Sequence, residues 1–137
     1  MTMACELCDS PGGEILWKGE RLRIVRVDEP GYPGFCRVIW REHVREMTDL
    51  APDDRAYLMS NVFAVETVLR EQLRPVKVNL ASLGTAVPHL HWHAIARFDD
   101  DPHFPNPVWS TAQRAARPGV HVVSSAALSA ALAVKLI

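Results

Sequence analysis

The sequence lacks the features that mark secreted, membrane-bound and nucleic-acid-binding proteins. Its three cysteines are an odd number, which argues against a disulfide framework and favours a reducing compartment. It has no cluster of Lys or Arg and a net charge of -1, so neither nucleic acid nor an anionic membrane is an expected partner. The first residues contain no basic region followed by an apolar run, so no secretory signal is expected and the predicted location is cytoplasmic.

The chain also lacks an uninterrupted apolar run long enough to cross a membrane. The most apolar stretch, residues 120–137, contains three serines and Lys135, and a run interrupted in this way spans a bilayer poorly. A terminal helix that begins near Ser124 or Ser125 explains the same stretch more simply. Its buried face is expected to carry leucines at helical spacing, namely Leu128, Leu132 and Leu136.

What is present is the composition of an ordinary globular domain. The 137 residues are 48% hydrophobic and 23% charged, which predicts one compact unit with a buried core. We expect a main domain over residues 1–110 and a C-terminal extension over residues 111–137 that packs on it and is helical from about residue 124. Because no basic surface is present, the ligand is expected to be a small molecule.

One long periodic run predicts a helix, and five shorter apolar runs predict strands. The sequence Pro52-Asp53-Asp54 is typical of a first helical turn, and apolar residues then recur at helical spacing until Pro75. Because strands and helices do not alternate, the pattern favours an α+β protein, with an antiparallel sheet and the helix on one face. The predicted strands are residues 14–17, 21–27, 35–40, 76–83 and 89–98.

Three histidines alternate with apolar residues in the last predicted strand, His89-Leu90-His91-Trp92-His93. Side chains alternate across a strand, so the histidines should share one face, about 7 Å apart, while the apolar residues face the helix. Imidazole is a good nucleophile near neutral pH because its reference pKa is about 6.5. Two chemistries stay open. His91 attacks while its neighbours bind phosphate, or a His-x-His pair chelates a catalytic zinc without a covalent intermediate.

The segment His-Leu-His-Trp-His-Ala-Ile resembles the signature of the histidine triad (HIT) family. The resemblance runs from Cys5 to about Trp109, and residues 101–109 look like those of a bacterial subgroup of nucleotide hydrolases and transferases. It implies a five-stranded antiparallel sheet with one long helix on one face, usually paired as a homodimer. It also implies activity on nucleotides that carry phosphoramidate, polyphosphate or adenylyl linkages. The C-terminal helix would be an addition to this fold.

The resemblance also implies roles for single residues. His91 matches the nucleophile, which attacks the α-phosphorus of a purine nucleoside phosphoramidate or dinucleoside polyphosphate and forms a nucleotidyl-histidine that water resolves. His93 matches the group that contacts the phosphate or the leaving-group oxygen. The residues that match substrate contacts are Asp28 for the ribose hydroxyls, and Asn79, Thr85 and the backbone of Ala86 and Val87 for phosphate.

Two positions depart from the pattern of family members that cleave dinucleoside polyphosphates. Those members often carry glutamine where Thr85 stands and proline where Ala96 stands. The sequence therefore leaves open the leaving group, the preferred base and whether the tail around Trp109 reaches a partner subunit's pocket. A nucleotide-binding regulatory module with weak or no activity stays an alternative to an enzyme.

The pair Cys5-x-x-Cys8 is by itself consistent with a metal site, a redox pair or two unremarkable thiols. Some HIT proteins hold a structural zinc through such a pair, a histidine after the third strand and the first histidine of the triad. The resemblance therefore implies a zinc bound by Cys5, Cys8, His43 and His89, and no organic cofactor. The alternative is that no metal binds here. The two cysteines are then terminal residues without a structural role, and His43 caps a loop. Cys36 is expected to be a buried free thiol.

Overall fold

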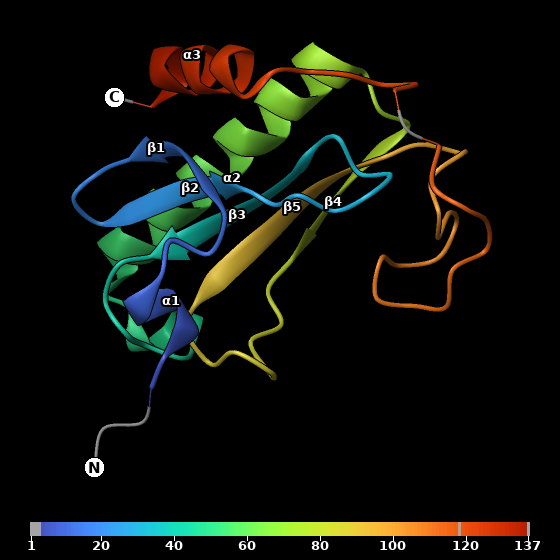
Figure 1. Ribbon diagram of the computed structural model, residues 1–137. Helices are drawn as coiled ribbons and strands as arrows, with labels where there is room; N and C mark the ends of the chain where they lie inside the picture. The colour runs from blue at the N-terminus through green and yellow to red at the C-terminus, as the bar shows by residue number, and fades with distance from the viewer. Residues whose placement is uncertain (1–3, 118, 137) are drawn as a thin grey trace.

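A five-stranded antiparallel sheet forms the centre of the protein, described here by a computed structural model that covers residues 4–117 and 119–136. The strand order is β1-β2-β3-β5-β4, so β1 and β4 are the outer strands (Figure 1). The α+β fold expected from the sequence is confirmed, because each of the five predicted strands is present. Their bounds are Glu14–Lys18 for β1, Leu22–Arg26 for β2, Phe35–Trp40 for β3, Lys77–Ala81 for β4 and His91–Arg97 for β5.

The described residues form one long helix and three shorter helical segments. Helix α2 spans Pro52–Leu73 and begins at the predicted proline; it ends where Arg74 adopts a left-handed conformation. The sequence pattern does not predict α1 or the 3-10 helix η1, because segments of four and three residues are too short to show a helical period. The bounds of the other three are Glu6–Asp9 for α1, Met47–Asp49 for η1 and Ser125–Lys135 for α3.

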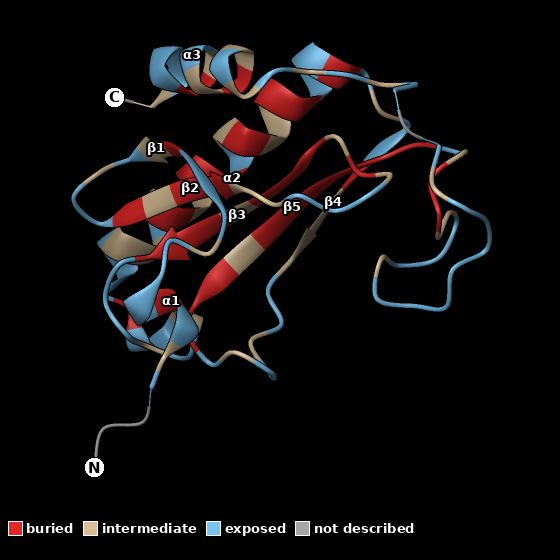
Figure 2. Ribbon diagram, in the orientation of Figure 1, coloured by how far each residue is buried: buried red, intermediate tan, exposed pale blue. Residues whose placement is uncertain are grey.

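Helix α2 covers one face of the sheet and forms the main core with it. Leu58, Val62 and Leu69 of α2 are completely buried, and they belong to one cluster with Ala94 and Ala96 of β5. Figure 2 shows this stripe of buried residues along α2 and the central strands. Each buried Val or Leu contributes about 1.5–3 kcal/mol of stability relative to an exposed one. This packing leaves the other face of β5 available for polar side chains.

The opposite face of the sheet is covered over β2 and β3 by α1 and the loop that follows it (Figure 1). Leu7 of α1 is buried against Val25 and Ile39. The Arg23 guanidinium donates hydrogen bonds of 2.7–3.0 Å to three carbonyl oxygens within residues 7–11. The N-terminal segment is therefore fastened to the sheet beside the triad.

Helix α3 packs on α2 and β1. Its first turn is capped by the Ser124 hydroxyl, which accepts a hydrogen bond of 3.0 Å from the backbone N–H of Ala127. Leu128 and Leu132 are each 1% exposed and join the main core. The additional C-terminal helix is thus confirmed, with its start at the predicted serines. Within the described residues, no helix combines the length and the apolar character needed to cross a membrane.

The last strand begins later than the sequence predicts. β5 starts at His91, and His89 and Leu90 lie before it. The backbone N–H of His89 bonds to Val87 within the same loop, and that of Leu90 bonds to Val44 after β3. The expectation that one strand carries all three histidines is therefore wrong, because the bond to Val87 holds His89 in the preceding loop.

Candidate active site and metal cluster

His91 and His93 project from the face of the sheet that lies opposite α2. In the β3–β5 ladder, His91 is paired with Ile39 and His93 with Arg37, whereas Trp92 packs against the helix-side core. The two imidazole rings are 4.9 Å apart between centroids. Both residues are buried, at 7% and 6% exposure, so the predicted pair of histidines lies side by side and largely shielded from solvent.

The His91 ring is held in one orientation by a backbone carbonyl group. Its Nδ1 lies 2.6 Å from the carbonyl oxygen of His89. Because a carbonyl oxygen only accepts, Nδ1 carries the ring proton and Nε2 keeps a lone pair. Burial, followed by the charge of Arg37, lowers the pKa of His91. The ring is therefore neutral near pH 7 and offers the lone pair that a nucleophile needs.

His93 is surrounded by other rings. Its centroid lies 5.9 Å from Phe35 and 5.0 Å from Trp109, and its Nδ1 is buried without a hydrogen-bond partner among the described residues. Burial, followed by the neighbouring His91, lowers the pKa of His93 to about 4. A neutral ring whose Nδ1 is enclosed can meet a ligand only through Nε2.

Trp109 is a residue of this site that sequence reasoning does not place. It reaches His93 because the segment after β5 folds back, held by a buried ion pair in which Arg97 Nε lies 2.7 Å from an Asp101 carboxylate oxygen. Arg97 Nη2 also donates to the carbonyl oxygen of Asn106 at 2.7 Å. The sequence offers one signal for this arrangement. Arg97 and Asp101 have opposite charges and are four residues apart, and a proline-rich segment that ends in Trp109 follows them.

The residues expected to bind phosphate lie in two places. Asn79 is on β4, and its side-chain oxygen accepts a hydrogen bond of 2.8 Å from Arg97 Nη1, which leaves its amide N–H groups for another partner. Thr85 and Ala86 are exposed in the turn before the triad. Val87 packs against the apolar cluster under α1. Their contact with a nucleotide stays a prediction.

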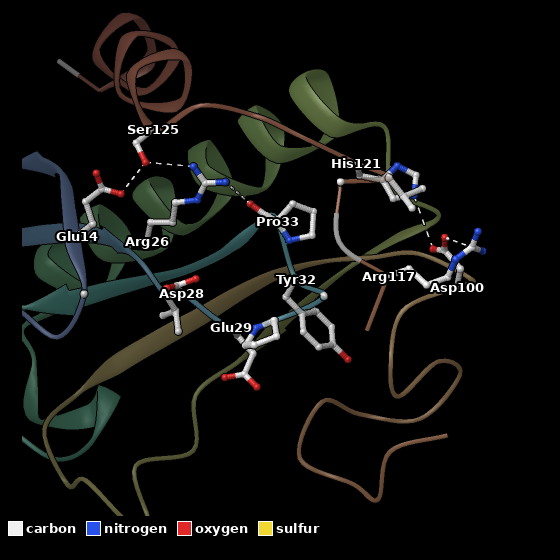
Figure 3. Close-up of a pocket in the computed structure, with 16 residues that line it drawn as sticks. Glu14, Arg26, Asp28, Glu29, Tyr32, Pro33, Asp100, Arg117, His121 and Ser125 are labelled. Atoms are coloured by element: carbon white, nitrogen blue, oxygen red, sulfur yellow. Dashed lines mark hydrogen bonds and ion pairs between the residues drawn. The ribbon is translucent and has the colours of Figure 1, made fainter. Parts of the chain in front are cut away.

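Asp28, the expected ribose ligand, lines a cavity of about 640 Å³ beside the end of β2. Figure 3 shows this cavity between the β2–β3 loop and the segment before α3. At one side of the cavity, the Ser125 hydroxyl donates to Glu14 at 2.5 Å and accepts from Arg26 at 3.1 Å. No triad histidine is among the described residues that line the cavity. Asp28 and His91 therefore do not share one cavity in this conformation.

The four predicted metal ligands Cys5, Cys8, His43 and His89 come together between α1 and the start of β5. Their ligand atoms all lie within 4.8 Å of one another. The three close contacts between sulfur and nitrogen are 3.4–3.5 Å, and the two Nδ1 atoms are 3.2 Å apart. Tetrahedral zinc requires edges of about 3.5 Å between sulfur and nitrogen and about 3.3 Å between nitrogens. The cluster therefore has the dimensions of a metal site.

The His89 ring is also oriented as a ligand. Its Nε2 lies 2.6 Å from the carbonyl oxygen of Trp40, so Nε2 carries the proton and Nδ1 presents a lone pair to the cysteines. A cation would satisfy this lone pair, that of His43 and the two sulfur atoms at once. The donor set fits a closed tetrahedral site, in which the protein supplies all four ligands.

Comparisons with known proteins agree with this geometry. The model of the HIT domain family matches residues 13–100. A histidine triad protein from Bradyrhizobium japonicum is 26% identical, with a TM-score of 0.76 over 99% of this chain and 98% of that one. One from Marinobacter aquaeolei is 25% identical, with a TM-score of 0.74 over 99% and 96% of the two chains.

A more distant likeness is one of fold alone. A hypothetical histidine triad nucleotide-binding protein from Sulfolobus tokodaii is 17% identical, with a TM-score of 0.59 over 90% of this chain and 83% of that one. No curated protein matches the chain. The two bacterial structures cover almost the whole chain, so their similarity includes the C-terminal helix.

Proposed function

The chain belongs to the HIT domain family, and on that premise we propose that it is a nucleotide hydrolase or nucleotidyl transferase whose nucleophile is His91. The proposed substrates are purine nucleoside phosphoramidates or dinucleoside polyphosphates. One observation carries the proposal, the bond of 2.6 Å between His91 Nδ1 and the His89 carbonyl oxygen. It fixes the tautomer in which Nε2 is the free, nucleophilic nitrogen.

The proposed reaction has two steps. Nε2 of His91 attacks the α-phosphorus, so that an N–P bond forms while the bond from phosphorus to the leaving nitrogen or oxygen breaks. The negative charge of the bound phosphate favours the protonated form of His93, which donates the Nε2 proton to the leaving atom. Water then attacks the nucleotidyl-histidine, returns a proton to His93 and releases the nucleotide from His91. In a transferase, another acceptor takes the place of water.

The proposed role of the Cys5, Cys8, His43 and His89 cluster is to hold a structural zinc ion. With four protein ligands the ion has no open position, so its contribution is folding energy. His89 would bind it through Nδ1 while the carbonyl oxygen of the same residue accepts from His91. A catalytic metal on the triad is less well supported, because the His89 ring is directed at the cysteines.

We further propose a homodimer that works in the cytoplasm on a small-molecule nucleotide. β4 is an outer strand, and the apolar residues Val76 and Leu83 near its ends are 60% and 56% exposed. An outer strand with exposed apolar neighbours is a surface on which a second chain can pair. Light scattering after size-exclusion chromatography should give the mass of two chains, and a monomer would contradict this part of the proposal.

A substrate panel tests the proposed activity. Adenosine phosphoramidates and dinucleoside polyphosphates are compared for wild type and His91→Ala, with AMP binding measured for both proteins. Turnover should be lost in the variant while AMP still binds, because other residues build the pocket. A variant that keeps turnover would contradict the role of His91. A wild-type chain that binds AMP but turns over no member of the panel would instead support the regulatory module.

A further inference from the structure

Arg37 is a charged residue on the face of the sheet from which His91 and His93 project. The reaction described above does not use it. It is paired with His93 in the β3–β5 ladder, and Ile39, two residues further along β3, is paired with His91. Because side chains of paired residues and of every second residue share a face, Arg37 lies on the same face of the sheet as both rings.

The hydrogen-bonding groups of Arg37 are mostly unused. Nη1 donates a bond of 2.9 Å to the carbonyl oxygen of Gly12. Nε is buried without a partner, and Nη2 is not buried and bonds to none of the described residues. Among these residues no carboxylate pairs with Arg37. A buried charged donor without an acceptor is costly, so this guanidinium is arranged for an acceptor that the protein does not supply.

Arg23 shows how a structural arginine on the same face is satisfied. It is paired with Ile39 across the β2–β3 ladder, and its Nε and Nη2 donate to three backbone carbonyl oxygens in the segment that contains α1. Among the described residues, Arg37 donates only to the carbonyl oxygen of Gly12. All of these Arg23 bonds hold the N-terminal segment against the sheet. In Arg37 only Nη1 has this role, so the role does not account for its other two nitrogens.

The free edge of Arg37 has the geometry that recognises an oxyanion. Nε and the neighbouring Nη2 donate in parallel and match two oxygen atoms of a carboxylate or phosphate. Arg97 in the same protein uses this edge, with Nε at 2.7 Å and Nη2 at 3.0 Å from the two oxygen atoms of Asp101. The Gly12 carbonyl holds Nη1 of Arg37, which leaves that same edge free.

We propose that Arg37 is a specificity-determining residue that binds a phosphate group of the substrate through Nε and Nη2, on the Gly12 side of His91. This inference rests on the proposed function of His91. A fixed positive charge beside the attacked phosphorus would also stabilise the negative charge that develops there. Arg37 therefore makes the site select nucleotides over uncharged nucleosides.

The test compares AMP with adenosine by isothermal titration calorimetry. Arg37→Met should weaken AMP binding about tenfold or more and change adenosine binding less than about twofold, because only the phosphate contact is lost. Arg21→Met is the control, since it removes one exposed arginine that is paired with Asp54, and it should change neither affinity. Equal loss for both ligands, or no loss for AMP, would overturn the inference.

A second variant covers the possibility that Arg37→Met does not fold. Arg37→Lys keeps the positive charge but lacks the pair of parallel donors, Nε and Nη2, that matches two oxygen atoms. It should fold as wild type does and lose part of the preference for AMP over adenosine. An unchanged preference would overturn the inference.

The inference and the proposed function fail in different ways. Binding of AMP is read without turnover, so an inactive chain whose AMP binding depends on Arg37 contradicts the enzyme but supports the phosphate contact. An active chain in which Arg37→Met keeps the AMP preference contradicts the contact alone.

Discussion

Two buried imidazole rings lie at the centre of the site, and their burial makes the protein sensitive to acid. The pKa of His93 is about 4 in the folded chain, because burial and then the neighbouring His91 disfavour its charged form. In the unfolded chain it is about 6.5. Between these values the unfolded chain binds a proton that the folded chain does not. The stability that this residue contributes is therefore present above pH about 6.5 and lost as the pH falls to about 4.

The free energy of unfolding should consequently fall less steeply between pH 7 and pH 4 in His93→Gln than in wild type. Urea unfolding at several pH values measures this, and parallel curves for the two proteins would contradict it. A side-chain NMR titration of wild type should give a midpoint for His93 near 4.

At this scale, the alternation of side chains suffices to predict that His91 and His93 share a face. It does not suffice for His89, whose ring is directed by the carbonyl oxygen of Trp40, 49 residues away. The free Nε and Nη2 of Arg37 also cannot be predicted, because the sequence does not show that the Gly12 carbonyl oxygen accepts from Nη1 alone. Side-chain direction depends here on contacts between segments that are distant in the sequence.

Among the elements, α1 is too short to be stable without its surroundings. It has four residues, and a helix this short is not stable alone because nucleation is unfavourable. Leu7 holds the middle of α1 in place, because its side chain is buried and its carbonyl oxygen accepts from Arg23. Cys5 contacts His89, and Cys8 contacts His43. A bound metal ion would therefore stabilise the N-terminal segment against the sheet.

Metal analysis tests this account of α1. Wild-type protein should contain about one zinc per chain, and Cys8→Ser should contain well below one. Cys36→Ala is the control, because Cys36 is a buried thiol outside the cluster, and it should keep the metal. Chelation should lower the midpoint of thermal unfolding in wild type. Wild-type protein that stays well below one metal per chain after reconstitution would contradict the zinc site.

The segment between β5 and Trp109 has no regular structure, and a buried ion pair holds it. Burial alone would raise the pKa of Asp101, but hydrogen bonds from Arg97 and from backbone N–H groups keep it below its usual value. Asp101→Asn should cost about 3–5 kcal/mol because it leaves the Arg97 charge buried and uncompensated.

An exposed ion pair offers the matched control for that substitution. Asp54→Asn breaks the pair with Arg21, whose side chains are 36% and 46% exposed, and should cost less than about 1 kcal/mol. Urea unfolding of both variants gives the comparison. Equal losses would contradict the anchoring role of Asp101.

Elements with strong local signals are predictable from this sequence, and those that depend on distant contacts are not. Pro52 and the acidic residues after it identify the start of α2, and Ser124 identifies the start of α3. The start of β5 is not predictable, because the backbone N–H groups of His89 and Leu90 bond to Val87 and Val44 in two loops, while only the Leu90 carbonyl oxygen accepts from Trp40 of β3. The folded-back segment before Trp109 has no local period at all.

Across the whole molecule, α3 shares one hydrophobic core with the sheet and α2. Leu132 is 1% exposed in that core, whereas Val134, two residues later, is 77% exposed. Leu132→Ala should therefore cost about 2–5 kcal/mol of unfolding free energy. Val134→Ala should change it by less than about 0.5 kcal/mol. A mild effect of Leu132→Ala would show that the helix does not support the domain.

The central claim is that His91 carries the nucleotide during the reaction, and mass spectrometry of the intact protein tests it most directly. Wild-type protein is mixed with an adenosine phosphoramidate, quenched within the first turnovers and analysed, and the modified peptide is then sequenced. We expect one added adenylyl group on His91, labile in acid, and none in His91→Ala. Turnover with no adduct at any quench time, or an adduct on another residue, would contradict the claim.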